Sequence, residues 1–280
     1  MRTLPAAVSP VLAGSGVAAF HDSFAASLAL LCLAVALALQ VGVNYANDYS
    51  DGVRGTDADR VGPMRLVGSG VARPASVKTA AFACFAIAGL AGLVIVLLTQ
   101  LWWLLAVGAS AIAAAWFYTG GRRPYGYYGL GEVFVFVFFG LVAVGGTVLV
   151  QLGYTPASTW AAALTIGALA CAILVANNLR DLRGDAAVGK RTLATRLGDR
   201  GTRWFFTALI VVATLSVVAV ALLTTAWALL GLAMLAFLAA PVRQVLAGAT
   251  GGALIRVLKL VGLGELAAAV GMATGLVLGG

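Results

Sequence analysis

Long runs of apolar residues, each with few or no charges, alternate along the chain with short polar segments. The hydrocarbon core of a bilayer is about 30 Å thick and takes roughly 20 helical residues to cross. The pattern therefore predicts about nine membrane-spanning helices. The predicted spans are residues 5–20, 24–46, 79–98, 101–118, 131–151, 159–178, 204–223, 225–241 and 263–280.

One basic stretch just before the last run has two interpretations. Residues 254–263 place Arg256 and Lys259 among leucines and valines. Such a segment is typical of a helix that lies in the membrane interface, and a loop would fit as well.

The composition excludes a soluble globular protein. Of the 280 residues, 62% are hydrophobic and 10% are charged, whereas soluble domains average roughly 45–50% and about 25%. Cys32, Cys84 and Cys171 each lie within an apolar run and show no ligand-like spacing, so we interpret them as packing residues. The predicted class is an all-α polytopic membrane protein with one domain over residues 1–280.

The positions of the basic residues predict the topology. If the N-terminus lies in the cytoplasm, all eighteen Lys and Arg residues fall in cytoplasmic segments, as the positive-inside rule requires. The net charge of +8 then reflects orientation and contact with anionic headgroups rather than a nucleic-acid surface. The Ala-, Gly- and Arg-rich composition suggests a bacterial source, so we expect a multi-pass protein of the bacterial plasma membrane.

The acidic residues gather in two short windows. Of the ten acids, seven lie between residues 48 and 59 or between 181 and 199. The first window follows the second apolar run. If the helix continues, Asn44, Asp48 and Asp51 share one face, and Asn47 pairs with Asp51 at a spacing of four.

The second window follows the sixth apolar run and has a similar spacing. Asn178, Asp181 and Asp185 fall at i, i+3 and i+7. An even number of spans separates the two windows, so both open on the same side of the membrane. We therefore expect two carboxylate clusters to face one another at the cytoplasmic end of the bundle, in a parallel internal repeat.

Facing carboxylates at a membrane boundary require a cation between them. Magnesium fits, because it takes oxygen ligands from one or two carboxylates together with substrate phosphates. Zinc would require nitrogen or sulfur ligands, and none is near. Basic residues interleaved with the acids suggest phosphate partners and hence a diphosphate substrate. These residues are Arg54, Arg60, Arg65, Lys190 and Arg191.

Polar and aromatic residues near the fifth run are weaker candidates for binding an acceptor or an apolar tail. Glu132 opens that run, either as a first-turn carboxylate or as part of a substrate groove. Tyr118 flanks the preceding loop, as an interfacial aromatic residue or as an acceptor ligand. Asn44 and Asn178 join this set because they lie beside the acidic residues.

Three strings together resemble the UbiA superfamily of intramembrane prenyltransferases: NDYSDGVRGTDADRVGPMRLVGSG at 47–70, GLGEVFVFVFFG at 129–140 and NNLRDLRGDAAVGKRTLATRLG at 177–198. They are most similar to the branch that prenylates 1,4-dihydroxy-2-naphthoate in menaquinone synthesis. The resemblance implies a Mg²⁺-dependent transfer of a polyprenyl group from its diphosphate to that aromatic acceptor, with loss of CO₂ and diphosphate.

The resemblance implies that Asn47, Asp51, Asp57 and Asp185 bind magnesium and that Arg65, Lys190 and Arg191 hold the diphosphate. The full set of candidates adds their neighbours in the acidic windows. Asp51, Asp181 and Asp185 are the catalytic candidates, and Asp181 is a candidate acceptor for a proton from the acceptor's hydroxyl. The candidate magnesium ligands are Asn47, Asp48, Asp51, Asp57, Asp181 and Asp185. The candidate diphosphate ligands are Arg60, Arg65, Lys190 and Arg191.

One spacing departs from the commoner superfamily pattern, and several alternatives stay open. Asp57 follows Asp51 by six residues rather than four, so Asp48, Asp57 or Asp59 completes the first metal site. The acceptor could also be 4-hydroxybenzoate, a homogentisate or a porphyrin. The start of a CDP-alcohol phosphotransferase signature is present at Asp48 but does not continue. A cation-coupled transporter would need polar residues deeper in the spans, which are almost free of them.

Overall fold

The computed structural model describes residues 4–55 and 64–280. In these two ranges all regular secondary structure is helical. In chain order the elements are α1 (Leu4–Phe20), α2 (Ala26–Arg54), α3 (Pro74–Thr99), α4 (Leu104–Phe117), η1 (Tyr125–Tyr128), α5 (Gly131–Val135), η2 (Phe136–Val142), α6 (Ala143–Leu152), α7 (Ala157–Ala187), α8 (Leu193–Leu223), η3 (Ala226–Met234), α9 (Leu235–Leu246) and α10 (Ala253–Gly279).

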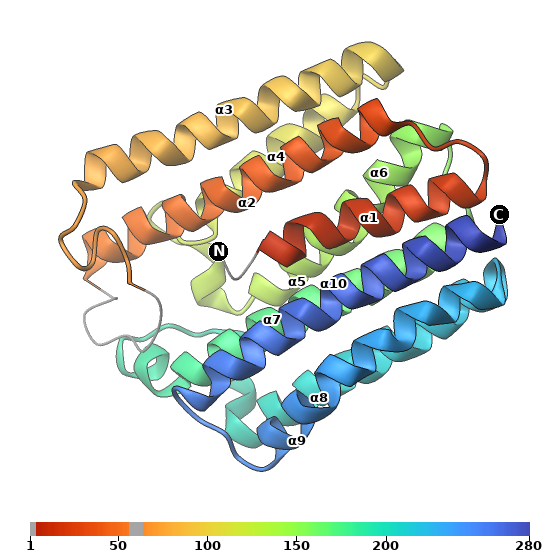
Figure 1. Cartoon of the computed structure of the whole chain (residues 1–280). Coiled ribbons are helices and arrows are strands. Elements are labelled where there is room, and N and C mark those ends of the chain that lie inside the picture. Colours follow the sequence, from red (N-terminus) through yellow and green to blue (C-terminus); the bar gives the residue numbers. More distant parts are fainter. Residues whose placement is uncertain (1–3, 56–63) are drawn as a thin grey trace.

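The predicted fold class is confirmed. Within the described ranges, seven helical segments are long and apolar enough to cross a membrane, and α1 and α4 are shorter apolar helices. These nine segments match the nine predicted runs. Figure 1 shows them as a bundle whose α1–α2 turn and C-terminus lie at one end. The opposite end, where α2 and α7 finish, carries the acidic windows and is called the motif end below.

The first acids of each window, Asp48 and Asp51 in one and Asp181 and Asp185 in the other, lie on helices that continue beyond the apolar runs. The second predicted run ends at residue 46, but α2 continues to Arg54. The sixth predicted run ends at residue 178, but α7 continues to Ala187. Helix α2 stops at Gly55, whose φ of 72° lies in the left-handed region that glycine adopts without strain. The helical spacing assumed for each acidic window is therefore present in the structure.

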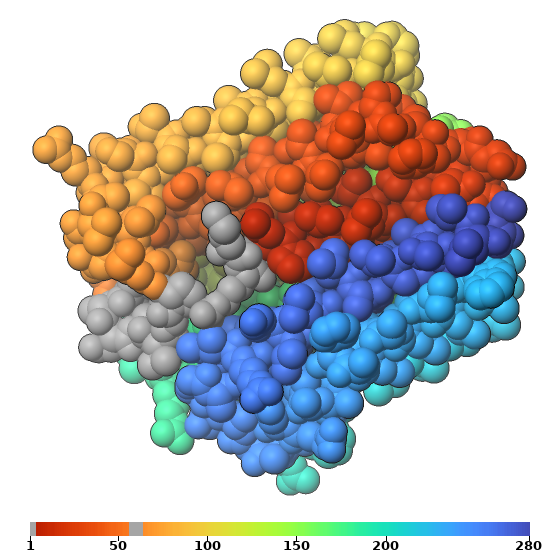
Figure 2. All heavy atoms as spheres, in the orientation of Figure 1, coloured from red at the N-terminus to blue at the C-terminus, as the bar shows by residue number. Residues whose placement is uncertain are grey.

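Helix α7 forms the centre of the bundle and packs against α1, α8, α10 and η2. Its buried face is rich in alanine, which lets neighbouring backbones approach closely. One such close approach is to η2, where a Cβ added at Gly140 would lie 2.8 Å from the Cα of Gly167. Figure 2 shows atoms of α1 packed directly on those of α10. In contrast, α3 lies at the edge and exposes apolar residues such as Leu90, which is 65% exposed, as expected for a lipid-facing helix.

The interpretation of residues 254–263 as an interfacial helix or a loop is wrong. They form the first turns of α10, which runs without interruption from Ala253 to Gly279. Leu254, Val257 and Val261 are fully buried in the bundle, whereas Arg256 and Lys259 lie on the exposed side. The helical spacing puts the apolar residues on one face, so the segment packs as part of a spanning helix.

Candidate active site

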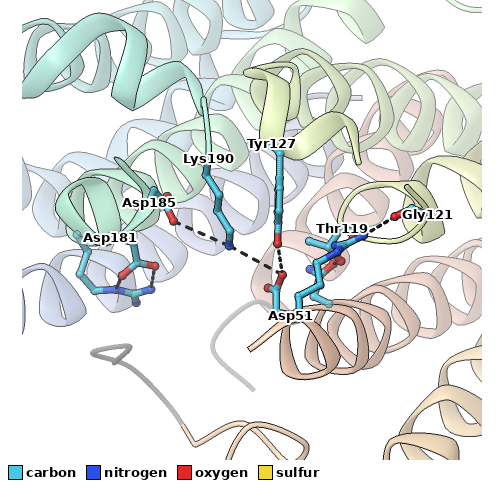
Figure 3. Close-up of polar contacts among 10 residues, drawn as sticks. Asp51, Thr119, Gly121, Tyr127, Asp181, Asp185 and Lys190 are labelled. Carbon is cyan, nitrogen blue, oxygen red and sulfur yellow. Dashed lines mark hydrogen bonds and ion pairs between the residues drawn. The ribbon is translucent and has the colours of Figure 1, made fainter. Parts of the chain in front are cut away.

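Asp51 and Asp185, one from each acidic window, approach the same ammonium group. The Nζ atom of Lys190, in the connection between α7 and α8, lies 3.9 Å from Oδ1 of Asp51 and 3.9 Å from Oδ1 of Asp185. Figure 3 shows the Lys190 side chain extending between the two carboxylates. The side chains of the three residues are between 7% and 14% exposed. The two helix ends therefore form one partly buried centre, as expected for facing clusters.

Tyr127 forms a wall of this centre. Its hydroxyl donates a hydrogen bond of 2.7 Å to Oδ1 of Asp51, and Lys190 Nζ lies 4.5 Å from the centroid of its ring. A cation over an aromatic face is stabilised by the ring quadrupole. Tyr127 belongs to the short helix η1, so the connection between α4 and α5 takes part in the site.

The neighbouring acid in the first window is engaged by backbone groups. The carboxylate of Asp48 accepts hydrogen bonds from the backbone N–H groups of Leu66 and Val67, at 2.8 and 3.0 Å. The side chain is buried. Asp48, a candidate magnesium ligand from the sequence, thus fixes the chain that returns to α2 just after residue 63.

The neighbouring acid in the second window is engaged by an arginine. Asp181 accepts hydrogen bonds from Nε and Nη2 of Arg180, the first at 2.7 Å. The Arg180 side chain is only 2% exposed, so this bidentate pair compensates a nearly buried guanidinium. Asp181 lies one helical turn before Asp185 on α7.

The end of α2 is also joined to the α4–α5 connection. Asn47 accepts a 2.8 Å hydrogen bond on Oδ1 from the Thr119 hydroxyl, and the Arg54 guanidinium donates to the carbonyls of Thr119 and Gly121. The candidate Arg65 lies in the described segment after residue 63 and is half-buried. Asp57, Asp59 and Arg60 lie outside the described residues.

Glu132 and Asn178 form a buried pair below the centre. Oε1 of Glu132 accepts a 2.9 Å hydrogen bond from Nδ2 of Asn178, and both side chains are buried. Oε2 of Glu132 has no hydrogen-bond partner among the described residues. A π-helical segment, η2, begins four residues after Glu132, and such segments occur frequently at functional sites.

Aromatic rings pack against one another between the α4–α5 connection and η2. Tyr118 packs edge-to-face on Tyr125 with ring centroids 5.5 Å apart, and Tyr125 stacks on Phe134 at 4.0 Å. Burial raises the pKa of the Tyr125 phenol above its ordinary value, and its hydroxyl donates to the carbonyl of Ala114. Asn44, by contrast, is exposed and donates from Nδ2 to the carbonyl of Gln40.

A pocket of about 390 Å³ opens beside the centre at the motif end. We call it the arginine pocket. It is lined by Arg54, Arg122, Pro124, Tyr127, Tyr128, Gly189, Arg191 and Arg196.

Arg191 and the preceding residue, Lys190, have different surroundings. The backbone N–H of Arg191 donates to the carbonyl of Tyr127 at 2.9 Å. This hydrogen bond fixes the α7–α8 connection against η1. The side chain of Arg191, expected from the sequence to bind diphosphate, lines the arginine pocket, whereas that of Lys190 points between the two carboxylates.

Two residues of interest were missed from the sequence. Tyr127 is one of several tyrosines that flank the loop before the fifth apolar run, which could form an interfacial belt or bind the acceptor, and nothing in its spacing links it to Asp51. Glu265 lies within α10, is fully buried, and neither carboxylate oxygen has a hydrogen-bond partner among the described residues. An acid inside an apolar run is a functional candidate by default, and that signal was available for Glu265.

Magnesium suits the donor set at the centre. Asp51, Asp185 and Asn47 supply carboxylate and amide oxygens, which are the hard ligands that Mg²⁺ takes. Within the described ranges no three His, Cys, Asp or Glu side chains form a ready-made metal cage. That fits a metal held by one or two carboxylates and completed by substrate phosphates.

Comparison with solved structures supports the fold. A UbiA homologue from Aeropyrum pernix aligns with a TM-score of 0.74, at 16% identity, over 98% of this chain and 97% of that one. A UbiA homologue from Archaeoglobus fulgidus, solved bound to DMAPP and Mg²⁺, aligns with a TM-score of 0.65, at 14% identity, over 99% and 98%.

Comparison with characterised sequences supports the family. The 1,4-dihydroxy-2-naphthoate octaprenyltransferase of Mycobacterium tuberculosis is 53% identical over 99% of this chain and 94% of its own length. The Escherichia coli protein of the same name is 38% identical over 75% of this chain and 70% of its own length. Residues 7–261 match the model of the UbiA prenyltransferase family. The chain therefore belongs to the UbiA prenyltransferase family.

Proposed function

We propose that this protein transfers a polyprenyl group from a polyprenyl diphosphate to 1,4-dihydroxy-2-naphthoate, releasing CO₂ and diphosphate and forming demethylmenaquinol. The observation that carries the proposal is the 53% identity, over almost the whole chain, to a relative with that named activity. The convergence of Asp51 and Asp185 on one cation position supports it, because a departing diphosphate requires charge neutralisation there.

The two carboxylates and Lys190 are proposed to hold the diphosphate end of the donor. Bound Mg²⁺ supplies charge neutralisation to the leaving diphosphate. Asp51 and Asp185 hold the metal, with Asn47 and Asp57 as further candidate ligands. The Lys190 contacts of 3.9 Å are long for hydrogen bonds, so its ammonium is proposed to turn towards diphosphate oxygens. Arg65 and Arg60 are further candidate ligands of the diphosphate.

The stacked rings of Tyr125, Phe134 and Phe138 are proposed to lie beside the allylic carbon when the acceptor attacks it. Loss of diphosphate leaves positive charge on the prenyl group, and the faces of Tyr125, Phe134 and Phe138 would stabilise it. Burial among these rings excludes water that would quench the cation. The electron-rich acceptor ring then attacks that carbon. Glu132 and Asn178 are proposed to contact the acceptor or the prenyl tail, and Asp181 stays a candidate to accept a proton from an acceptor hydroxyl.

The proposed setting is the bacterial plasma membrane with the N-terminus and the motif end in the cytoplasm. In the described ranges, the turns at the opposite end, around residues 21–25, 100–103, 153–156 and 224–225, contain no Lys or Arg. This distribution agrees with the positive-inside rule. The prenyl tail would lie against the apolar helices, in contact with membrane lipids.

Product analysis tests this function. The purified protein in nanodiscs would be incubated with a polyprenyl diphosphate, Mg²⁺ and either 1,4-dihydroxy-2-naphthoate or 4-hydroxybenzoate, and products would be identified by mass spectrometry. We expect a prenylated, decarboxylated naphthol only with Mg²⁺ and the naphthoate. Prenylated hydroxybenzoate in its place would assign the protein to another acceptor, and no product with either acceptor would contradict the proposal.

A further inference from the structure

The arginine pocket is strongly cationic and has an aromatic wall. Arg54, Arg122, Arg191 and Arg196 contribute four guanidinium groups, and two tyrosines contribute their rings. No acidic side chain is among the described residues that line it. Its volume of about 390 Å³ lies within the range of small-molecule sites, roughly 300–1,000 Å³. The pocket therefore suits a small aromatic anion.

Two of the four guanidinium groups already donate hydrogen bonds to backbone carbonyls of the protein. Arg54 donates to the carbonyls of Thr119 and Gly121, and Nη2 of Arg196 donates to the carbonyl of Tyr128 at 2.9 Å. These contacts fix the α4–α5 connection against α2 and α8. Both arginines therefore shape the pocket and are poorly suited to changing partners.

The other two guanidinium groups are available to a ligand. Arg122 and Arg191 are exposed, and neither side chain has a hydrogen bond or an ion pair with any residue in the described ranges. A guanidinium matches the geometry of a carboxylate and can bind both of its oxygens. The pocket thus presents two uncommitted carboxylate-binding groups.

The pocket also borders the reaction centre. Tyr127 lines the pocket, and its hydroxyl donates to Asp51. Figure 3 shows this residue directed at Asp51 beside Lys190. A molecule resting on Tyr127 is therefore separated from the proposed diphosphate position by one side chain.

The two proposed substrates differ in where they are soluble. The polyprenyl donor partitions into lipid, whereas a hydroxylated aromatic acid arrives from water. The arginine pocket lies at the motif end, beyond the apolar runs, where the α4–α5 and α7–α8 connections meet the last residue of α2 and the first turn of α8. It is placed to receive the water-borne partner while the tail approaches along the lipid-facing helices.

We propose that the arginine pocket is the docking site for the carboxylated aromatic acceptor, with Arg122 and Arg191 binding its carboxylate and the rings of Tyr127 and Tyr128 packing on its aromatic face. The proposal rests on the proposed function, since it concerns the acceptor of that reaction. It assigns Arg191 to the acceptor in place of the diphosphate. Selection of an acidic acceptor over a neutral one then depends on these two arginines.

Steady-state kinetics with matched variants test the proposal. Arg122→Gln and Arg191→Gln would be compared with Arg123→Gln, a change to the adjacent exposed arginine that does not line the pocket. We expect KM for 1,4-dihydroxy-2-naphthoate to rise about tenfold in each pocket variant, the usual effect of losing one charge-assisted contact. KM for the polyprenyl diphosphate should stay within about twofold.

A neutral acceptor sharpens the test. The compound 1,4-dihydroxynaphthalene lacks the carboxylate. We expect the ratio of kcat/KM for the naphthoate to kcat/KM for this compound to be about tenfold lower in Arg122→Gln than in the wild type, and to be unchanged in Arg123→Gln. A rise in KM confined to the diphosphate would instead assign the pocket to the donor. A rise in KM for the naphthoate that is seen only in nanodiscs with anionic lipid would assign the arginine pocket to lipid headgroups. Either result, or unchanged kinetics, would overturn the proposal.

Equilibrium dialysis of 2-naphthoate, a carboxylate without the reactive hydroxyls, separates this proposal from the proposed function. Binding to the wild-type protein that weakens about tenfold in Arg122→Gln supports the pocket even if no naphthoate is prenylated. Prenylation with equal 2-naphthoate binding in both proteins would support the function and reject the pocket.

Discussion

The two acidic windows meet at the ammonium group of Lys190, but the acids of the two windows are held in different ways. In the first window, Asp48 is bound by two backbone N–H groups of the returning chain, and Asp51 faces the centre. In the second window, Asp181 is bound by the side chain of Arg180, and Asp185 faces the centre. Among the acids on the ends of α2 and α7, each window thus has one that anchors structure and one that faces Lys190.

The difference lies in what each anchoring acid supports. Asp48 fixes a loop, so its loss should loosen the chain around the site while the bundle stays intact. Asp181 compensates a guanidinium that is 2% exposed, so its loss leaves a charge in a nearly buried position. Residues with the same spacing and chemistry in the sequence therefore differ in their expected contribution to stability.

The largest expected effect comes from the two acids that face the centre. Asp51→Asn and Asp185→Asn should each lower the rate of product formation at least about a hundredfold, because each removes a carboxylate from the proposed metal position. The measurement is product formation by mass spectrometry at saturating Mg²⁺. Asp199→Asn, at a carboxylate that is 57% exposed and paired with Arg203, is the control and should retain most of the activity.

Removing the anchor of the second window should mainly cost stability. Asp181→Leu leaves Arg180 nearly buried without its partner, which costs about 3–5 kcal/mol. The thermal midpoint of the detergent-solubilised protein measures this effect. The double variant with Arg180→Met should recover much of the loss, and a double variant no more stable than Asp181→Leu alone would contradict the anchoring role.

Removing the anchor of the first window should have a smaller effect. Asp48→Ala leaves the N–H groups of Leu66 and Val67 without their acceptor, and we expect a loss of about 1–3 kcal/mol. Limited proteolysis should show faster cleavage in the segment after residue 63, while the turnover number at saturating substrate falls by less than about threefold. A fall as large as that of Asp51→Asn would place Asp48 among the metal ligands instead.

The effect expected at Tyr127 falls on the reaction rate rather than on the stability of the fold. Tyr127→Phe keeps the ring and removes the hydrogen bond to Asp51, which is worth about 1.5–3 kcal/mol when the acceptor is charged. The turnover number should fall about tenfold with little change in KM for the aromatic acceptor. A selective rise in that KM would show that the hydroxyl binds the acceptor rather than orienting Asp51.

Much of the fold was predictable because membrane helices have strong local signals. The nine apolar runs follow from length and hydropathy. The continuation of α2 past Asp51 and of α7 past Asp185 agrees with the helical spacing of these acids. The approach of Asp51 and Asp185 followed from counting spans. Their roles as metal ligands, and those of Asn47 and Asp57, stay predictions.

Other features depend on contacts that helical spacing does not encode. The placement of Lys190 between the carboxylates depends on how one connection folds, and the two N–H groups on Asp48 come from a different loop. The arginine pocket combines three segments far apart in the sequence. The basic stretch before the last run was misread because the fully buried Leu254 and Val257 have their packing partners elsewhere in the bundle.

The central claim is that Asp51 and Asp185 act together on a single metal–diphosphate unit. Calorimetric titration of a non-reactive polyprenyl thiodiphosphate, with and without Mg²⁺, tests it directly in the wild type, Asp51→Asn, Asp185→Asn and the double variant. The account predicts that Mg²⁺ tightens binding to the wild type, that each single variant loses this gain, and that the double variant loses no more. Full Mg²⁺-dependent tightening in either single variant would contradict it.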